Sequence, residues 1–194
     1  MNAAIFTYDY TDLQRFRFVQ NPTPGGLPIL TFGNAGETKA SGVELEVVAQ
    51  PTDAWHLGLT YGYLDAEFEN FVTSSGNFTG NVPARSPENS FSAYVQFGAT
   101  NMSWADFSGR VDYAWRDDWY DTDANTANRK TDALGLLNAR LALTSKSGRY
   151  TAALWGRNLT DEVSQSSFSV GLGPGIGRLL IPGRTYGVEL SAGF

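Results

Sequence analysis

Apolar and polar residues alternate with a period of two along most of the chain, which predicts β-strands rather than helices. The clearest run spans residues 55–63, where Trp55, Leu59 and Tyr63 share one face while Gly58 and Gly62 share the other. Eight such segments follow one another, and no segment shows a convincing helical period. The sequence therefore predicts an all-β, antiparallel fold of about eight strands.

In each predicted strand one face is apolar and the other is polar. On the first strand the apolar face is assigned to Ala4, Phe6, Tyr8 and Tyr10. The register of the seventh strand is chosen so that its apolar face begins at Tyr150, which leaves Trp155 on the polar face. Ten ionisable residues fall on the polar faces of the predicted strands: Asp9, Glu44, Glu46, Asp106, Arg110, Asp112, Arg116, Arg140, Arg157 and Glu189.

Both a soluble barrel and a membrane barrel have two such faces, so alternation alone does not say which face points outward. A charge at the midplane of a lipid-facing strand costs about 2–4 kcal/mol, and ten charges in strand centres beside Gly, Ser and Thr favour a wet lumen. The runs of about nine to eleven residues are long enough to cross a bilayer when tilted.

The connections alternate in length, as they do in outer-membrane barrels, where short turns face the periplasm and long loops face outward. We therefore predict a transmembrane β-barrel segment. The short connections are 51–54, 98–102 and 145–148, and the long ones are 17–39, 67–87, 117–133 and 159–182.

Composition removes several other classes of protein. The chain has no cysteine, which excludes disulfides and thiolate metal sites, and its net charge of −6 argues against nucleic acid as a partner. The single histidine, His56, has no serine and carboxylate around it that would suggest an enzyme. Residues 121–125 have the first spacings of a calcium loop, but Thr126 stands where the turn needs glycine. We expect no cofactor and no metal.

The last fifty residues resemble a known family. The segment 153–162 contains Asn158-Leu159-Thr160-Asp161, residues 182–188 begin Pro182-Gly183-Arg184-Thr185-Tyr186, and the chain ends in Phe194. The segments 34–46 and 4–10 are similar to other barrel segments of the same family. Together these motifs resemble the TonB-dependent outer-membrane receptors.

The resemblance implies that residues 1–194 are the C-terminal part of a receptor barrel. Because the family has a plug domain inside a 22-stranded barrel, we expect a fragment holding the last eight strands, without the plug or a signal peptide. The implied function is import of a siderophore, cobalamin or similar nutrient across the Gram-negative outer membrane. The implied partners are outer-membrane lipid, the barrel-assembly machinery, the missing plug and barrel strands, and TonB through that plug.

Three sets of residues follow as candidates. The aromatic residues of the long loops are the candidates for ligand contact, and a set of charged residues on the lumen wall is predicted to form a network that faces the plug. Phe194 resembles the C-terminal signal for barrel assembly. The ligand candidates are Phe68, Phe71, Phe78, Trp119 and Tyr120, and the predicted wall network is Arg110, Asp112, Arg116, Arg140 and Arg157.

Two other interpretations stay open on the sequence alone. The chain could close by itself as an eight-stranded structural barrel of the outer membrane, which would need no plug and no ligand. It could instead be a soluble ligand-binding β-barrel, whose apolar face would point inward.

Overall fold

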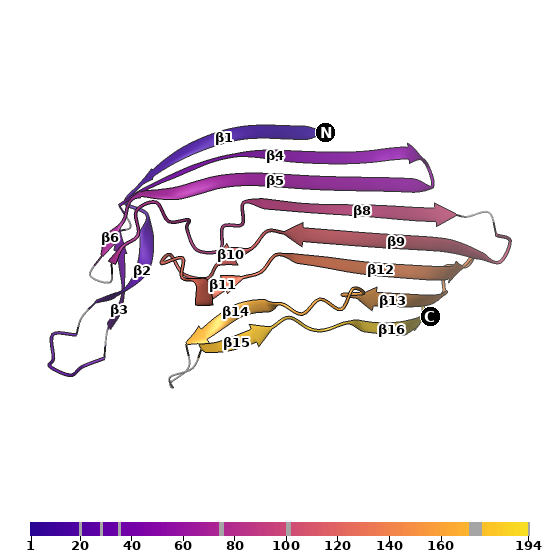
Figure 1. Cartoon of the computed structure of the whole chain (residues 1–194). Helices are drawn as coiled ribbons and strands as arrows, with labels where there is room; N and C mark the ends of the chain where they lie inside the picture. The colour runs from indigo at the N-terminus through magenta and orange to yellow at the C-terminus, as the bar shows by residue number, and fades with distance from the viewer. Residues whose placement is uncertain are drawn as a thin grey trace.

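The fold is a single curved antiparallel sheet of eight strands with smaller hairpins at one end (Figure 1). The computed structural model describes residues 1–19, 21–27, 29–34, 36–73, 76–99, 102–170 and 176–193. Each strand pairs with the next strand of the sheet along the chain, as the alternating pattern predicts. The strands are β1 (Asn2–Thr11), β4 (Glu37–Thr52), β5 (Trp55–Asn70), β8 (Asn89–Ala99), β9 (Ala105–Arg116), β12 (Leu134–Ser145), β13 (Tyr150–Arg157) and β16 (Thr185–Ala192).

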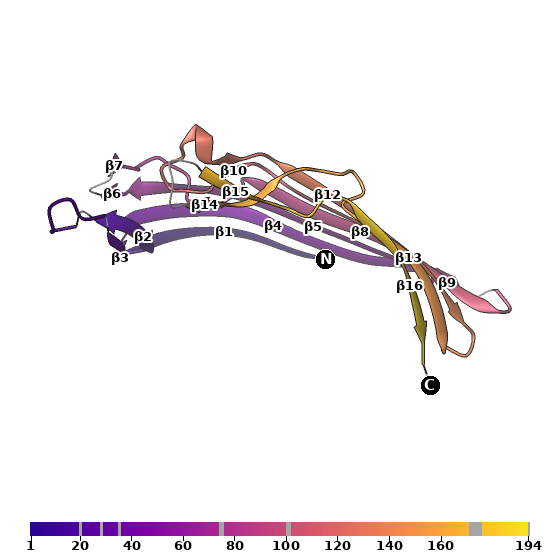
Figure 2. The ribbon, with the colours of Figure 1, turned by 90° about the horizontal axis from the view of Figure 1, so that it is seen from below.

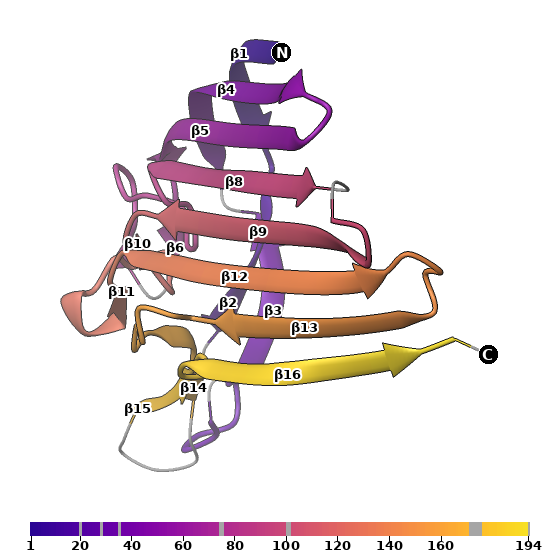
Figure 3. The same cartoon turned by 90° about the vertical axis from the view of Figure 1, so that its right-hand side faces the viewer.

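The sheet is open. Its order runs β1-β4-β5-β8-β9-β12-β13-β16, and no pairing in the described ranges joins β1 to β16. Figure 3 shows these two strands at opposite edges of the sheet. An unpaired edge leaves a row of main-chain donors and acceptors that other strands can complete. The structure therefore has the form of a barrel segment rather than a closed eight-stranded barrel.

Short turns lie at one end of the sheet and long connections at the other, as predicted. The four long connections are 12–36, 71–88, 117–133 and 158–184, and each contains a small hairpin of its own. Figure 2 shows these hairpins together at the end of the sheet away from the short turns. The hairpin elements are β2 (Gln14–Val19), β3 (Ile29–Asn34), β6 (Val72–Thr73), β7 (Gly76–Asn77), β10 (Trp119–Tyr120), the 3-10 helix η1 (Ala127–Arg129), β11 (Lys130–Thr131), β14 (Gln165–Val170) and β15 (Ile176–Leu180).

Strands β4 and β5 are longer than the sequence pattern predicted. Each has 16 residues, so the chain from Glu67 to Asn70 is strand rather than loop. On the apolar face of β5 the charge-free stretch ends at Tyr63, and the following residues on that face are Asp65 and Glu67. The two strands thus continue beyond the apolar band toward the long connections.

Strand pairing confirms the predicted faces of seven strands, because residues directly opposite each other in an antiparallel pair share a face. Val43 lies opposite Tyr63, Leu57 opposite Val95, and Leu141 opposite both Gly109 and Leu154. Trp155 lies opposite Arg140 and is therefore on the polar face, as the chosen register required.

The predicted face of β1 was wrong by one residue. Phe6 lies opposite Gly42, and Ala4 lies opposite Glu44, so the aromatic residues of β1 are on the polar face. Ile5 lies opposite Val43 and takes the apolar face instead. The small residue at position 42 explains this register, because a Cβ atom there would overlap the ring of Phe6. Asp9, assigned to the polar face, lies opposite Lys39 and shares a face with Ile5.

No described segment covers the apolar face of the sheet. Its large side chains are exposed or part-exposed, and the few fully buried side chains lie near the long connections instead. The soluble-barrel interpretation predicts that this face lines a core, and no core forms on it among the described residues. No helix in the described ranges has the length and apolar character to span a bilayer. Exposed members of the apolar face include Ile5, Leu59, Val95, Val111, Leu141, Leu154, Val188 and Leu190.

Candidate functional site

The aromatic residues at the end of β5 form a buried cluster instead of an open surface. The exposed fraction is 0% for Phe68 and 3% for Phe71. The ring of Phe71 lies 4.7 Å from that of Phe68 and 5.3 Å from that of Phe78, centroid to centroid, and Leu13 packs on the same cluster. Of the three predicted ligand candidates here, only Phe78 is part-exposed. In this conformation Phe68 and Phe71 hold the loops on the sheet.

The first long connection reaches the same cluster through Arg15. Its guanidinium lies 5.7 Å from the ring centroid of Phe68, within the range of a cation–π contact. Its Nε also lies 3.9 Å from a carboxylate oxygen of Asp123 in the third long connection. Arg15 therefore joins the first and third connections over the aromatic cluster of the second.

The second and third connections are held together by hydrogen bonds in which Asp121 and Asp123 accept and Asn125 both accepts and donates. The side chain of Asn125 bonds both main-chain groups of Val82. Asp123 Oδ1 accepts a hydrogen bond from the main-chain nitrogen of Ala84 at 2.8 Å. We call this arrangement of 121–125 on 81–85 the loop clasp.

An ion pair completes the loop clasp. Arg85 donates to Asp121 Oδ1 from Nε at 2.8 Å and from Nη2 at 2.6 Å, and its main-chain nitrogen bonds the carbonyl of Tyr120. The acidic spacing that resembled the start of a calcium loop therefore serves loop–loop contact. Within the described ranges no group of three or more acidic or histidine residues is placed to hold a metal ion.

The predicted ligand candidates Trp119 and Tyr120 form β10 beside a small hollow. The guanidinium of Arg116 stacks 3.6 Å from the ring centroid of Trp119. Nearby, Lys130 pairs with Asp118 at 2.6 Å, and this hydrogen bond raises the pKa of Lys130. The hollow has a volume of about 200 Å³ and is lined by Val82, Ser86, Glu88, Asp117, Asp118, Trp119 and Tyr120.

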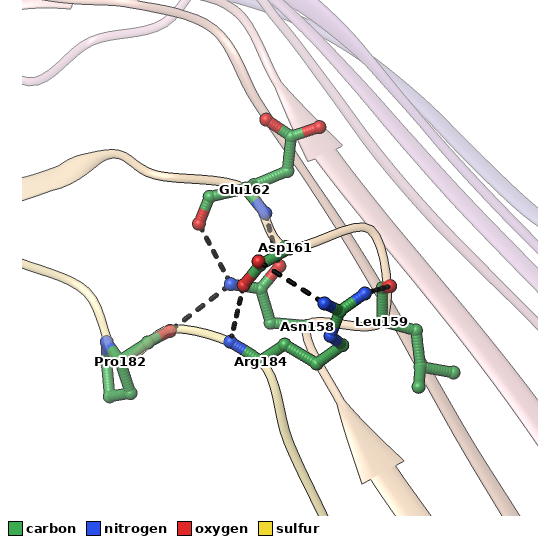
Figure 4. A network of polar contacts seen from close by, with 6 residues as sticks. All are labelled: Asn158, Leu159, Asp161, Glu162, Pro182 and Arg184. Atoms are coloured by element: carbon green, nitrogen blue, oxygen red, sulfur yellow. Dashed lines mark hydrogen bonds and ion pairs between the residues drawn. The ribbon is translucent and has the colours of Figure 1, made fainter.

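The fourth long connection is closed by the motif that carried the family resemblance (Figure 4). Asn158, which is 5% exposed and has a positive φ, donates to the carbonyls of Glu162 and Pro182 and accepts from the nitrogen of Glu162. Asp161 Oδ1 accepts a hydrogen bond from the nitrogen of Arg184 at 3.0 Å. The Asn-Leu-Thr-Asp and Pro-Gly-Arg motifs thus meet in space and tie together the two ends of this connection.

Among the described residues, members of the predicted wall network form two separate ion pairs instead of one continuous network. Arg110 donates to Asp112 Oδ1 from Nε and Nη2, at 2.9 and 2.6 Å. Its guanidinium also lies 4.0 Å from the ring centroid of Tyr94, whose ring covers Gly58 so closely that a Cβ atom there would overlap it. The pair is therefore fixed by a layer of packed groups beneath it.

The second ion pair joins Arg140 to Glu189 at 3.2 Å, across the intervening strand β13. Arg140 lies directly opposite Arg110, a like-charge placement that is unfavourable unless each cation has its own partner. The remaining members of the predicted network contact aromatic rings: Arg116 stacks on Trp119, and Arg157 lies 5.7 Å from the centroid of Trp155. A hollow of about 220 Å³ lies among Asp112, Arg140, Trp155, Arg157 and Glu189.

Phe194, the predicted assembly signal, lies outside the described residues. The contacts among the long connections were missed on the sequence, although the Asp-x-Asp-x-Asn spacing was the visible signal of one of them. Nothing in the sequence paired that segment with residues 81–85.

Comparison with known proteins gives a consistent result. The family model of the TonB-dependent receptor-like β-barrel matches residues 1–159. The ferric yersiniabactin uptake receptor FyuA from Yersinia pestis aligns with a TM-score of 0.78 and 20% identity, covering 99% of this chain and 27% of that one.

Two further solved structures agree. The siderophore receptor PiuA from Acinetobacter baumannii aligns with a TM-score of 0.69 and 21% identity over 97% of this chain and 25% of its own. The ferric-catecholate import receptor Fiu from K12 E. coli aligns with a TM-score of 0.67 and 21% identity, covering 98% of this chain and 24% of that one. The chain therefore spans about a quarter of the solved proteins that it matches.

Proposed function

The chain belongs to the family of TonB-dependent receptor-like β-barrels, and we propose that it is part of an outer-membrane receptor that imports a siderophore, cobalamin or a similar nutrient. Its homologues are transport receptors and not enzymes. In this proposal the short turns face the periplasm, the long connections form the extracellular mouth, and TonB supplies energy through a plug domain that lies outside this chain.

The observation that carries the proposal is the separation of the two faces of the sheet. The apolar face stays exposed, with no described segment to cover it, while the polar face carries the paired charges of the wall. Lipid is the environment that hides such a face without a protein core. This favours the outer membrane as the location, with outer-membrane lipid as the partner of the apolar face.

At the mouth, the geometry favours Trp119 and Tyr120 over the phenylalanine cluster as ligand contacts. Both are part-exposed and line the hollow of about 200 Å³, whereas Phe68 and Phe71 are buried. Phe78 is part-exposed at the edge of its cluster and stays a candidate. We propose that Phe68 and Phe71 support the ligand surface from beneath.

The polar wall is proposed to face the plug. Its ion pairs Arg110–Asp112 and Arg140–Glu189 are half-exposed, so their charges are open to a second surface. A plug with exposed polar groups would pair with such a wall without burying an unpaired charge. By resemblance to the family, Phe194 would be read by the barrel-assembly machinery.

The experiment that tests the function is an uptake assay in the bacterium that makes the full-length receptor. Deletion of the gene is expected to abolish TonB-dependent uptake of one labelled compound from a panel of ferric siderophores and cobalamin. The substitutions Trp119→Ala and Tyr120→Ala are expected to weaken binding of that compound. Trp55→Ala, which removes an aromatic ring at the opposite end of the sheet, serves as a matched control. Unchanged uptake of the whole panel in the deletion strain would contradict the proposal.

A further inference from the structure

A second pair of hollows lies on the apolar face near the short turns, far from the mouth. One has a volume of about 470 Å³ and is lined by residues of β9, β12, β13 and β16 together with Trp104. The other has a volume of about 270 Å³ and begins where the first one ends, since both are lined by Leu143 and Ala152. Together they form one groove along the strands, which we call the apolar groove.

The groove exists because a small residue stands between large ones. Ala152 lies opposite Leu143 on one side and Leu190 on the other, and its methyl group leaves the space between them unfilled. From Tyr150 to Leu154 the groove extends over about 13 Å of strand, at roughly 3.3 Å per residue. That length is close to the ~15 Å of hydrocarbon in one leaflet of a bilayer.

The end of the groove at the short turns has the residues that are typical of a lipid headgroup zone. Trp104 is 64% exposed and Tyr150 is 61% exposed, and such amphipathic rings are enriched where hydrocarbon meets water. The adjoining turn, 146–149, contains Lys146 and Arg149. Lys146 pairs with Asp106, whereas the exposed guanidinium of Arg149 has no ion pair among the described residues.

The turn 146–149 differs from the other short connections in its basic residues. The other short connections, 53–54 and 100–104, contain no lysine or arginine, and the whole chain has a net charge of −6. Among the three short connections, the cations that could attract an anionic headgroup therefore lie in this turn.

We propose that the apolar groove binds an acyl chain of an anionic phospholipid of the periplasmic leaflet, with the phosphate held at Arg149 between Trp104 and Tyr150. The side-chain stem of Arg149 is long enough to bring its charge to the interface beside these rings. The occupant is a lipid, because the groove follows the strands across the apolar band and ends at Tyr150, the residue that follows Arg149 of the basic turn. The proposal needs the membrane-facing sheet but not the transported ligand.

The test uses the purified full-length receptor in nanodiscs of equal parts phosphatidylglycerol and phosphatidylcholine. Native mass spectrometry after mild delipidation counts the lipids that stay bound. We expect phosphatidylglycerol to be retained in preference, and Arg149→Gln to reduce that preference about fivefold, since one cation near a membrane surface contributes about 1 kcal/mol. Ala152→Phe, which fills the groove, is expected to lower retention of both lipids.

Two variants serve as controls. Ala93→Phe adds the same bulk to the apolar face outside the groove, and Arg184→Gln removes a cation from the opposite end of the sheet. Neither is expected to change lipid retention, and heat-modifiable migration on a gel checks that every variant folds. An unchanged lipid preference in Arg149→Gln would overturn the proposal. So would a dimer mass that Ala152→Phe abolishes, because the groove would then hold a second copy of the chain.

Discussion

The side chain of Asn125 pairs with the main chain of Val82 as a neighbouring strand would. Asn125 Oδ1 accepts from the nitrogen of Val82 at 2.8 Å, and Nδ2 donates to its carbonyl at 2.9 Å, although 43 positions separate the two residues. Asn125 also has a φ of 49°, a conformation that asparagine tolerates better than most residues. One side chain thus fixes the second long connection on the third.

Replacement of this amide should loosen one loop from the other. Asn125→Ala removes both hydrogen bonds to Val82 and is expected to lower the free energy of local opening of this loop contact by about 1–2 kcal/mol. Hydrogen exchange at the main-chain nitrogen of Val82 should accelerate about tenfold. Asn77→Ala is the control, since the side chain of Asn77 accepts a hydrogen bond from its own turn at Thr79, and it should leave exchange at Val82 unchanged. Equal exchange in both variants would show that Asn125 does not hold the loops.

A second prediction concerns the motif that closes the fourth connection. Asn158→Ala leaves two carbonyls and one nitrogen without their partner in a buried position, so we expect a loss of about 2–3 kcal/mol. Arg184→Ala should cost less than about 1 kcal/mol, because its side-chain contacts are 3.5 Å long and exposed. The temperature at which the folded form is lost on a gel ranks the variants. If the Arg184 variant loses its folded form at a lower temperature than the Asn158 variant, Arg184 rather than Asn158 is the main stabilising residue of this motif.

The wall pair Arg110–Asp112 gives a third prediction. Asp112→Asn leaves Arg110 opposite Arg140 without its carboxylate partner. The free energy of unfolding of this variant should therefore fall by about 1 kcal/mol. Adding Arg110→Gln should restore most of that loss, since the repulsion is then removed. Urea unfolding in lipid vesicles at low and high salt measures both effects, and screening should reduce the loss at high salt. A double variant with a lower free energy of unfolding than either single variant would contradict repulsion between Arg110 and Arg140 as the cause.

How far the sequence predicts the fold depends on what each residue must contact. Residues of β5 and β8 such as Leu57 and Val95 were placed correctly, because lipid-facing strands keep one face free of charge over their whole length. The loop contacts of Asn125 were not predictable, since a hydrogen bond between loops leaves no period in the sequence. The burial of Phe68 was missed for a related reason: the pattern of β5 stops at Tyr63, while the strand itself continues.

The error on β1 has its own physical cause. Aromatic residues suit either a lipid face or a lumen wall, so Phe6 and Tyr8 did not fix the register, whereas Gly42 and Ala40 opposite them did. Nitroxide labels at Ile5→Cys and Phe6→Cys test this. The Ile5 label should collide with oxygen dissolved in lipid, and the Phe6 label should not. Val95→Cys and Gln96→Cys on β8 calibrate the two faces, and oxygen accessibility at Phe6 equal to that at Val95 would restore the original prediction.

The last prediction separates a lipid-facing surface from a packed one. A charge on a lipid-facing strand is costly in proportion to its depth, so Val111→Arg in the centre of β9 should lose about 2–4 kcal/mol. Tyr63→Arg at the boundary of the apolar band should cost about 0–1 kcal/mol beyond the loss of the ring, because arginine there reaches water. Ser108→Arg, on the polar face of β9, should be tolerated. Reversible unfolding in vesicles measures all three. A protein core would penalise Tyr63→Arg and Val111→Arg alike, whereas lipid ranks them by depth, so equal losses would remove lipid as the partner of this face.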